Sequence, residues 1–219
     1  MQAARLPSPS QTFWDRIAPK YAKQPIKDPA AYEAKLARVR ALLSPLDHVL
    51  EIGCGTGATA IKLAPGVAQV TGTDGSQGMI DIARRRLGPN APRNVAFQKA
   101  DAEDMVEGQP FDAICAFSLL HLVDDLPRVL TSVRGQLKPG GLFISKTVAL
   151  KNGNVLMRLM VRAMMAIGVA PRVIFLSTDD IVRGLVDAGF EIEDKRYLSK
   201  SRINPFIVAR RKVSSSRAA

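Results

Sequence analysis

The sequence predicts an α/β fold in which a parallel sheet is covered by helices on both faces. Short apolar runs alternate with segments of helical spacing from residue 48 to residue 148. The run at 111–117 (FDAICAF) is nearly all apolar, which is typical of a strand buried on both faces. A glycine-rich stretch directly follows the first apolar run and indicates a tight strand-to-helix turn. A chain of 219 residues suits one such domain with a small appendage.

Five strands and three helices alternate through the middle of the chain. We predict strands at 48–52, 69–73, 95–99, 111–117 and 142–148, and helices at 58–63, 77–87 and 126–137. Pro-Gly or Gly-Pro pairs follow each of these helices, and Lys138-Pro139-Gly140-Gly141 is expected to end the third. A methionine-rich apolar insertion at 151–177 then interrupts the pattern. A helix at 178–188 with Thr178 as its N-cap, and two strands at 190–198 and 205–210, complete the fold.

Two helices are predicted ahead of the first strand. The first covers residues 12–22 with a break at Pro19, after a Pro/Ser-rich leader that we expect to be mobile up to Gln11. The second covers 30–43, where apolar residues at helical spacing indicate one buried face. The predicted organisation is therefore 1–43 as N-terminal covering helices, 44–211 as the main domain with a substrate-side insertion at 151–177, and 212–219 as a basic flexible tail.

The formal net charge of +11 points first to nucleic acid or an anionic membrane as a partner. Its distribution weakens that interpretation. Residues 1–43 hold 8 Lys/Arg and 3 Asp/Glu, residues 44–194 hold 15 and 17, and residues 195–219 hold 8 and none. A nucleic-acid enzyme fits this distribution, and so does a near-neutral enzyme with basic flanks.

Cysteine, histidine and hydropathy patterns exclude several classes of protein. Two cysteines cannot staple a secreted domain, and two cysteines with two histidines have no metal-ligand spacing, so no zinc site is expected. Residues 1–14 lack the apolar core of a secretory signal, and no uncharged stretch reaches about 18 residues. We expect a cytosolic protein with reduced thiols and, through its basic ends, peripheral contact with the inner face of a membrane.

The most informative motif is the loop at 51–57 (EIGCGTG), between the first strand and the first helix. Its glycines let the backbone approach a ligand, and the following helix start offers free N–H groups. The motif is ambiguous by itself, because Gly53, Gly55 and Ala58 also satisfy the dinucleotide pattern G-x-G-x-x-G/A. Asp74, at the end of the second strand, suits a ribose diol in either case.

Four further motifs separate the two interpretations. Together with the glycine loop they occur along the chain in the order VLEIGCGTG, VTGTD, KADAED, FDAICAFSLLHLVDD and LKPGG. This set of motifs resembles the class I S-adenosylmethionine-dependent methyltransferases. The sequence is similar to the small-molecule and lipid branch, with its ubiquinone/menaquinone C-methyltransferases and bacterial phospholipid N-methyltransferases. The resemblance is dense over 49–148 and looser over 178–211. It implies a Rossmann-like seven-stranded sheet with a final antiparallel hairpin, and S-adenosyl-L-methionine as cofactor.

The resemblance also implies roles for individual residues. Glu51 and the loop would shape the methionine end of the cofactor site, Asp74 would take the ribose hydroxyls, and Asp101 would meet the adenine. Ser118 would flank the methyl donor, while Trp14 and Tyr21 would cover the cofactor. The full implied set is Trp14, Tyr21, Glu51, Gly53, Cys54, Gly55, Gly57, Asp74, Gly75, Ser76, Asp101, Ala102, Glu103 and Ser118. We interpret the Cys54 and Cys115 side chains as small core groups rather than nucleophiles.

Catalysis and acceptor binding leave alternatives open. His121 follows the fourth strand and could take a proton from the acceptor, or it could be structural. In the insertion, Arg158 and Arg162 share a helix face among four methionines, which suits an apolar acceptor with an acidic head or an anionic leaflet. A helix packed on the core with solvated arginines is the alternative.

The predicted function is methyl transfer to a small-molecule or lipid-like acceptor by in-line displacement, mainly through positioning. One alternative is a non-catalytic cofactor-binding protein that engages an anionic partner through its basic ends. A nucleic-acid methyltransferase is disfavoured, because Ser118-Leu119-Leu120-His121 stands where an Asn/Asp-Pro-Pro-Tyr motif would be expected.

Overall fold

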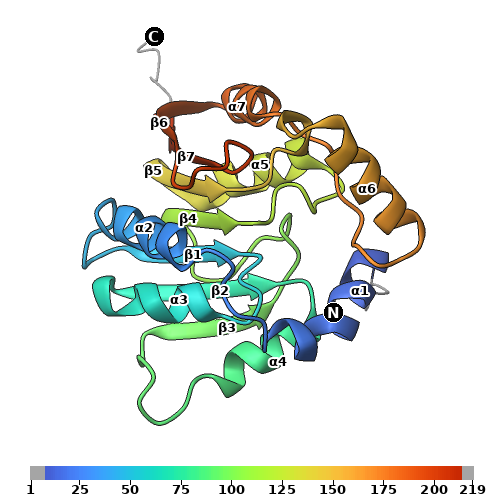
Figure 1. The fold of residues 1–219 in the computed structure, drawn as a ribbon. Helices are drawn as coiled ribbons and strands as arrows, with labels where there is room; N and C mark the ends of the chain where they lie inside the picture. The colour runs from blue at the N-terminus through green and yellow to red at the C-terminus, as the bar shows by residue number, and fades with distance from the viewer. Residues whose placement is uncertain (1–7, 214–219) are drawn as a thin grey trace.

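Seven strands form one mixed sheet at the centre of the computed structural model, which describes residues 8–213 (Figure 1). The strand order is β3-β2-β1-β4-β5-β7-β6. Strands β1 to β5 pair in parallel, whereas β7 runs antiparallel to both β5 and β6. The strands are β1 (His48–Ile52), β2 (Gln69–Asp74), β3 (Val95–Lys99), β4 (Phe111–Phe117), β5 (Leu137–Lys146), β6 (Phe190–Tyr197) and β7 (Pro205–Arg211). The predicted Rossmann-like sheet with a final antiparallel hairpin is confirmed.

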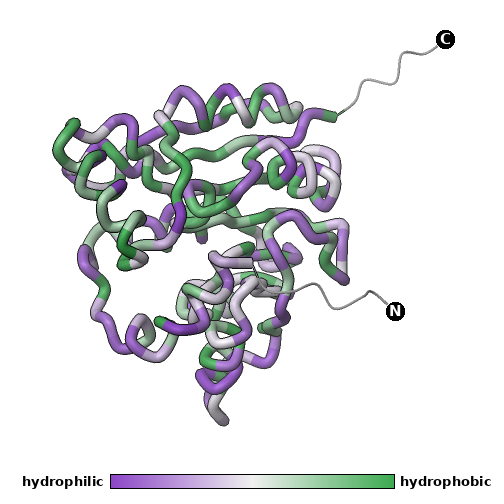
Figure 2. Tube along the Cα trace, turned by 90° about the vertical axis from the view of Figure 1, so that its right-hand side faces the viewer, coloured by the Kyte–Doolittle hydropathy of each residue, from purple (hydrophilic) through white to green (hydrophobic). Residues whose placement is uncertain are grey.

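Helices cover both faces of this sheet. They are α1 (Pro9–Tyr21), α2 (Pro29–Arg40), α3 (Ala58–Leu63), α4 (Gln77–Arg85), α5 (Leu126–Gln136), α6 (Val155–Ala166) and α7 (Thr178–Asp187), with short 3-10 turns η1 (Ala64–Gly66) and η2 (Leu150–Asn152). One apolar layer joins the sheet to α5 and α7, and a second joins it to α2, α3 and α4. Hydrophobic segments accordingly run through the interior when the molecule is viewed from the side of α1 and α6 (Figure 2).

Helix α1 differs from its prediction at both the leader and Pro19. Ser8 and Gln11 form a reciprocal capping box, so the helix begins at Pro9 and residues 8–11 are ordered into it. Pro19 lies inside the helix and does not break it, because the N–H of Ala22 still donates to the carbonyl of Ala18. Capping at one end and continued bonding at the other outweigh the hydrogen bond that the proline removes.

Strand β5 begins five residues earlier than the sequence predicts. Leu137 already pairs with Phe111, and the register shifts between Phe111 and Ala113. Gly140 has a φ of 78°, which lets the strand bend at the shift. Gly140 and Gly141 therefore lie within an irregular strand and not in a loop between α5 and β5.

The N-cap of α7 is Ser177 and not Thr178. The Ser177 hydroxyl accepts from the N–H of Asp180, and the Asp180 carboxylate accepts from the N–H of Ser177. Thr178 is buried instead, within hydrogen-bond distance of Asn152 and Tyr197. Both residues can cap a helix, and packing decided between them.

The insertion forms α6, which lies beside the sheet on the same side as α1 (Figure 1). No residue of α6 is buried, and Leu156, Leu159 and Met160 are more than half exposed. The guanidinium of Arg16 in α1 donates to the carbonyl of Gly168 just beyond α6. Between residues 8 and 213, none of the helices is long and apolar enough to cross a membrane.

The final part of the basic tail lies outside the described residues. Lys212 and Val213 follow β7, and positions 214–219 are not described. The prediction for 212–219 is therefore not tested there.

Candidate functional site

A cavity opens at the carboxyl ends of β1, β2, β3 and β4. These ends meet at one edge of the sheet, on either side of the point where the strand order reverses, and ligands bind there in open α/β sheets. The cavity encloses about 1100 Å³ of space that is continuous with solvent. It is lined by Ser8, Ser10, Gln11, Trp14, Tyr21, Gly53, Gly55, Asp74, Gly75, Ser76, Met79, Ala100, Asp101, Ala102, Glu103, Phe117, Ser118, Leu119, Leu122, Val123 and Asp124.

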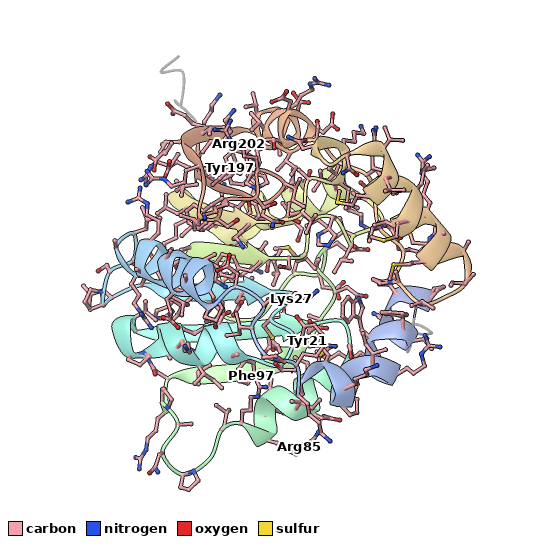
Figure 3. All side chains as sticks on the ribbon, in the orientation of Figure 1. Tyr21, Lys27, Arg85, Phe97, Tyr197 and Arg202 are labelled. Atoms are coloured by element: carbon pink, nitrogen blue, oxygen red, sulfur yellow. The ribbon has the colours of Figure 1, made fainter. Side chains whose placement is uncertain are left out.

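The glycine loop supplies one wall of this cavity. Gly53, Gly55 and Gly57 all have positive φ angles, between 54° and 76°. A Cβ atom on Gly53 would lie 2.7 Å from Leu119, and one on Gly57 would lie 2.5 Å from Phe97, which is labelled in Figure 3. A Cβ on Gly55 would meet nothing within 4 Å. Gly53 and Gly57 are thus required by packing, whereas Gly55 leaves space next to the backbone for a ligand.

Asp74 is fixed at the floor of the cavity by the backbone. One carboxylate oxygen accepts from the N–H of Gly55 and the other from the N–H of Ser76, both at 2.9 Å. Burial raises the pKa of Asp74, and these two hydrogen bonds oppose the shift. Each oxygen retains a further lone pair, so the carboxylate can still accept from a diol.

Helix α1 is attached to the loops that follow β2 and β3. The Asp15 carboxylate accepts from the Ser76 hydroxyl at 2.6 Å and from the N–H of Gly78 at 2.8 Å, at the N-terminus of α4. The Gln11 amide donates to Asp101 at 2.5 Å. Gln11 and Asp15 are four residues apart and share one helix face, so a single face of α1 holds both loops.

Aromatic residues of α1 close the cavity from above the loops. Trp14 packs edge-to-face against both Phe13 and Tyr21, with ring centroids 5.5 and 5.8 Å apart. Tyr21 stands at the end of the helix (Figure 3), and burial together with the charge of Asp74 raises the pKa of its phenol. Tyr21 therefore stays protonated at neutral pH and remains a hydrogen-bond donor.

Ser118 adopts a backbone conformation that is uncommon for a residue with a side chain. Its φ is 56°, the one positive value at a non-glycine position among the described residues. The N–H of Ser118 donates to the carbonyl of Lys146 at 2.7 Å, which holds this conformation at the end of β4. Such strain gathers at functional sites because the surrounding structure must maintain it.

Most of the predicted cofactor residues converge on this cavity. Those that line it are Trp14, Tyr21, Gly53, Gly55, Asp74, Gly75, Ser76, Asp101, Ala102, Glu103 and Ser118. Glu51, Cys54 and Gly57 do not line it, because all three side-chain positions turn into the core. Gln11, Met79, Phe117 and Leu122 are lining residues that the sequence did not single out. For Gln11 the only signal was its N3 position three residues after Ser8, in a segment that we expected to be mobile.

His121 lies behind the cavity wall rather than in it. Its Nδ1 is 2.9 Å from the hydroxyl of the buried Thr147, and Ile174 donates its N–H to the His121 carbonyl. Burial lowers the pKa of His121 to about 4, so the ring is neutral at physiological pH. This placement favours the structural role over the base, of the two roles left open by the sequence.

Arg158 and Arg162 lie on α6, away from the residues that line the cavity. The Arg162 guanidinium stacks over the Phe175 ring at 5.0 Å. The structure keeps the two arginines on one exposed helix and does not bring either into the cavity wall.

The residues present fit S-adenosylmethionine. Gly55 leaves a gap that a side chain would fill, and Asp74 offers acceptors beyond its two backbone bonds. The polar side chains of Asp74 and Asp101 line the cavity at two neighbouring strand ends. Apolar walls come from Met79, Leu119 and Trp14.

Comparison with known proteins agrees with this fit. The model of a family described as "Methyltransferase domain" matches residues 49–141. A ubiquinone biosynthesis O-methyltransferase of Coxiella burnetii is 35% identical over 102 residues, which cover 46% of this chain and 43% of that protein. A demethylmenaquinone methyltransferase of Symbiobacterium thermophilum is 34% identical over 105 residues, which cover 46% and 42%. The similarity spans less than half the length of either relative.

Solved structures share the fold over nearly the whole chain. An S-adenosylmethionine-dependent methyltransferase from Thermotoga maritima superposes with a TM-score of 0.69 at 24% identity, over 92% of this chain and 99% of that one. A magnesium protoporphyrin IX methyltransferase from Synechocystis with bound S-adenosylhomocysteine gives 0.68 at 19% identity, over 93% and 96%. The [4+2]-cyclase SpnF gives 0.73 at 20% identity, over 93% and 95%. At these identities the likeness concerns the fold.

The sequence family, the sheet order and the glycine-lined cavity agree with one another. Residues 49–141 match a methyltransferase domain, and the chain is similar to S-adenosylmethionine-dependent methyltransferases in sequence over this region and in fold over nearly its whole length.

Proposed function

We propose that this chain transfers a methyl group from S-adenosylmethionine to a small, predominantly apolar acceptor. The observation that carries the proposal is the convergence of Gly55, Asp74, Asp101 and Ser118 from four strand ends on one cavity covered by α1. In this assignment Asp74 accepts from the ribose hydroxyls, Asp101 accepts from the adenine amine, and Gly55 lies against the methionine end. Within the predicted N-terminal unit, α1 and α2 act as the covering helices of the domain.

The chemistry asked of the protein is mainly positioning. The bound cofactor supplies a sulfonium methyl that is already electrophilic. The cavity wall at the end of β4, beside the reacting carbon, is fixed by two residues. The carbonyl of Lys146 holds Ser118 in its strained conformation, and Leu119 packs against Gly53. Trp14 and Tyr21 exclude water from above. A base in the protein is needed only if the acceptor must lose a proton before transfer, and the placement of His121 outside the cavity favours an acceptor that reacts without one.

An apolar acceptor is supported by the surroundings of the cavity and by the relatives. Leu119, Leu122 and Val123 line the cavity on the side of β4. Two relatives have names that place them in quinone biosynthesis, and quinone precursors are apolar. We therefore assign the acceptor to the small-molecule or lipid-like class rather than to nucleic acid.

We also propose that α6 approaches an anionic membrane surface. Val155, Leu156, Leu159 and Met160 expose between 54% and 76% of their area on a helix that carries Arg158 and Arg162 and no acidic residue. Exposed apolar groups with flanking arginines are typical of interfacial helices. Such a contact would bring a lipid-like acceptor to the cavity from the bilayer.

Calorimetry tests the cofactor site. S-adenosylhomocysteine should bind the wild-type chain, and Asp74→Ala should weaken binding at least tenfold because two hydroxyl contacts lose their acceptor. Asp81→Ala, on α4 with only a surface bond to Gln77, is the matched control and should bind as wild type. Equal affinity in wild type and Asp74→Ala would remove the ribose assignment.

Product mass tests the acceptor class. The chain is incubated with labelled S-adenosylmethionine and a panel of catechols, polyprenylated quinone precursors, phosphatidylethanolamine and transfer RNA. Label should appear in an apolar product, with S-adenosylhomocysteine formed in equal amount. Label in RNA alone would overturn the acceptor class, and cofactor binding without turnover of the panel or of a cell extract would support a non-catalytic binding protein.

Vesicle sedimentation tests the membrane contact. Wild type should sediment with vesicles that contain phosphatidylglycerol more than with pure phosphatidylcholine, and 0.5 M salt should reduce the difference. The double variant Leu156→Gln/Leu159→Gln should lose most of the binding. Thr131→Gln, at an exposed position on α5, is the control. Unchanged sedimentation of the double variant would refute the role of α6.

A further inference from the structure

Gln11 connects the first turn of α1 to the part of the cavity that contains Asp101. Both residues line the cavity, although they are 90 positions apart in the chain. Gln11 lies outside the residues that match the family model, and none of the five sequence motifs includes it. Its role in the site follows from its contacts instead.

Both ends of the Gln11 amide form hydrogen bonds. The Oε1 atom accepts from the backbone N–H of Ser8 at 2.6 Å, and the Nε2 atom donates to Oδ1 of Asp101 at 2.5 Å. A backbone N–H can only donate and a carboxylate can only accept, so one orientation of the amide satisfies both partners. The capping box of α1 therefore sets which atom of Gln11 faces Asp101.

The backbone of Asp101 is fixed by a turn. The Asp104 carboxylate accepts from the N–H of Asp101 at 2.8 Å, and the Asp101 carbonyl accepts from the N–H of Asp104 at 3.1 Å. A Cβ atom on Gly75 would lie 2.5 Å from Oδ1 of Asp101 and 3.3 Å from Nε2 of Gln11, so this glycine leaves the space in which the two side chains meet. With Oδ1 held by Gln11, Oδ2 of Asp101 is the acceptor left for a ligand.

We propose that Gln11 is a positioning residue for recognition of the adenine base, because it holds Oδ1 of Asp101 and thereby directs Oδ2 towards the 6-amine of the cofactor. This inference rests on the proposed function, since it requires that the cavity binds S-adenosylmethionine with its adenine at Asp101. It also makes base recognition depend on α1, because the capping box that orients Gln11 belongs to the first turn of that helix.

The presence of glutamine rather than glutamate at position 11 supports this role. Either residue completes a capping box at the third position of a helix. A glutamate here would still accept from Ser8, but its second oxygen would face the Asp101 carboxylate, and two like charges in contact repel each other. Helix capping is therefore compatible with both residues, whereas the contact with Asp101 requires a donor.

The test is the preference of each variant for S-adenosylhomocysteine over S-inosylhomocysteine, in which an oxygen acceptor replaces the 6-amine. Calorimetry gives this preference as the ratio of the two dissociation constants. Wild type should prefer the adenine ligand about tenfold or more, because the inosine oxygen would face a carboxylate that can only accept. In Gln11→Glu the preference should fall to about threefold or less, because the Asp101 carboxylate loses the bond that orients it. The added charge affects both ligands, so the ratio reports orientation.

An exchange of the two side-chain types gives a sharper result. In Asp101→Asn, Gln11 still donates to the side-chain oxygen at position 101, so the amide nitrogen there replaces Oδ2 and donates to the ligand. This variant should prefer the inosine ligand. In the double variant Gln11→Glu/Asp101→Asn, the new carboxylate accepts from that nitrogen and the side-chain oxygen faces the ligand, so the preference for adenine should return. A role confined to helix capping would produce neither the reversal nor the return.

Gln77→Glu is the matched control. Gln77 also donates through Nε2 to an aspartate, Asp81, at 2.7 Å, but this pair lies on the exposed surface of α4. The control makes the same chemical change and adds the same charge, and it should keep the wild-type preference. If Gln11→Glu detaches α1, Asp101→Asn decides by itself, because it keeps both Gln11 and the capping box.

The outcomes separate this inference from the function on which it rests. Binding of neither ligand to wild type would overturn the proposed function. A wild-type preference that Gln11→Glu leaves unchanged would overturn only the role of Gln11. Asp101→Asn without a preference for the inosine ligand would do the same, because an amide that Gln11 does not orient can turn to suit either ligand.

Discussion

Three glycines in one loop have positive φ angles for different physical reasons. Gly57 has no room for a Cβ, since Phe97 and Ala83 would lie at 2.5 and 2.9 Å, whereas Gly55 has free space beside it. Glycine is therefore needed for core packing at position 57, whereas at position 55 it leaves space for a ligand next to the backbone.

Alanine at these two positions should separate stability from binding. Gly57→Ala should lower the free energy of unfolding by about 2 kcal/mol or more, because left-handed strain adds to a core clash. Gly55→Ala should cost about 1 kcal/mol from strain alone but weaken S-adenosylhomocysteine binding at least tenfold. Urea unfolding and calorimetry measure the two effects. A Gly55→Ala variant that binds as wild type would show that the ligand does not approach this backbone.

His121 makes stability depend on pH. Its pKa is lowered to about 4 in the folded chain against about 6.5 when unfolded, so the unfolded state binds the extra proton as the pH falls from 6.5 towards 4. Between pH 7.5 and 5.5 the wild type should lose about 1 kcal/mol more unfolding free energy than His121→Asn. Urea titrations at both pH values measure the difference. Parallel losses in the two proteins would mean that His121 is not buried in its neutral form.

At the level of elements, α1 covers the cavity with Trp14 and Tyr21 and is held there by its polar face. Its polar face carries Gln11 and Asp15, and Asp15 adds a carboxylate to the N-terminus of α4, where the helix dipole favours negative charge. The helix therefore depends on the two loops that it covers.

Asp15→Ala should release the covering helix. We expect a loss of about 1 kcal/mol in unfolding free energy, faster proteolytic cleavage ahead of residue 28 and weaker cofactor binding. Thr12→Ala, which removes only a surface bond to the Ser8 carbonyl, should do none of these. Limited proteolysis with and without S-adenosylhomocysteine is the measurement, and cleavage at the wild-type rate would argue against this anchor.

At the scale of the whole molecule, the sheet order makes one binding site from distant segments. Ligand binding should accordingly stabilise the entire fold, by about 2.7 kcal/mol at a ligand concentration 100 times the dissociation constant. For a chain of this size the melting temperature should rise by about 5–10 °C with S-adenosylhomocysteine. The dinucleotide NAD shares the glycine pattern in its own sites and should give no shift. A larger shift with NAD would reverse the choice of cofactor.

Ion pairs compensate part of the positive charge near both ends of the chain. Arg38 of α2 forms an ion pair with Asp194 of β6 at 3.2 Å, and Arg210 pairs with Glu193. The first pair joins α2 to the last hairpin, and the second joins the two strands of that hairpin. The cavity does not contribute to the net charge of +11, because its charged lining residues are the acidic Asp74, Asp101, Glu103 and Asp124.

The alternation of strands and helices, the strand β4 and the loop from Gly53 to Gly57 could be predicted because local patterns encode them. Periodicity follows from which face is buried, and glycine follows from a local backbone angle. The start of β5 and the cap of α7 could not be predicted, since each depends on a partner distant in the chain. The continuation of α1 through Pro19 was missed for a different reason, because a proline normally ends a helix and here the local bond from Ala22 to Ala18 maintains it.

The sequence by itself determined the α/β class, the resemblance to methyltransferases and the residues on the strand ends, because these are carried by contiguous motifs. Only the tertiary structure decided that Gln11 and Asp15 attach α1 to two loops, and that His121 bonds the buried Thr147 instead of lining the cavity. These contacts join positions between 26 and 90 residues apart, and their energies come from burial and from charges brought together by folding. A sequence pattern does not show which distant residues come into contact. The hydrogen bonds and pKa shifts of the site can therefore be derived only from the folded chain.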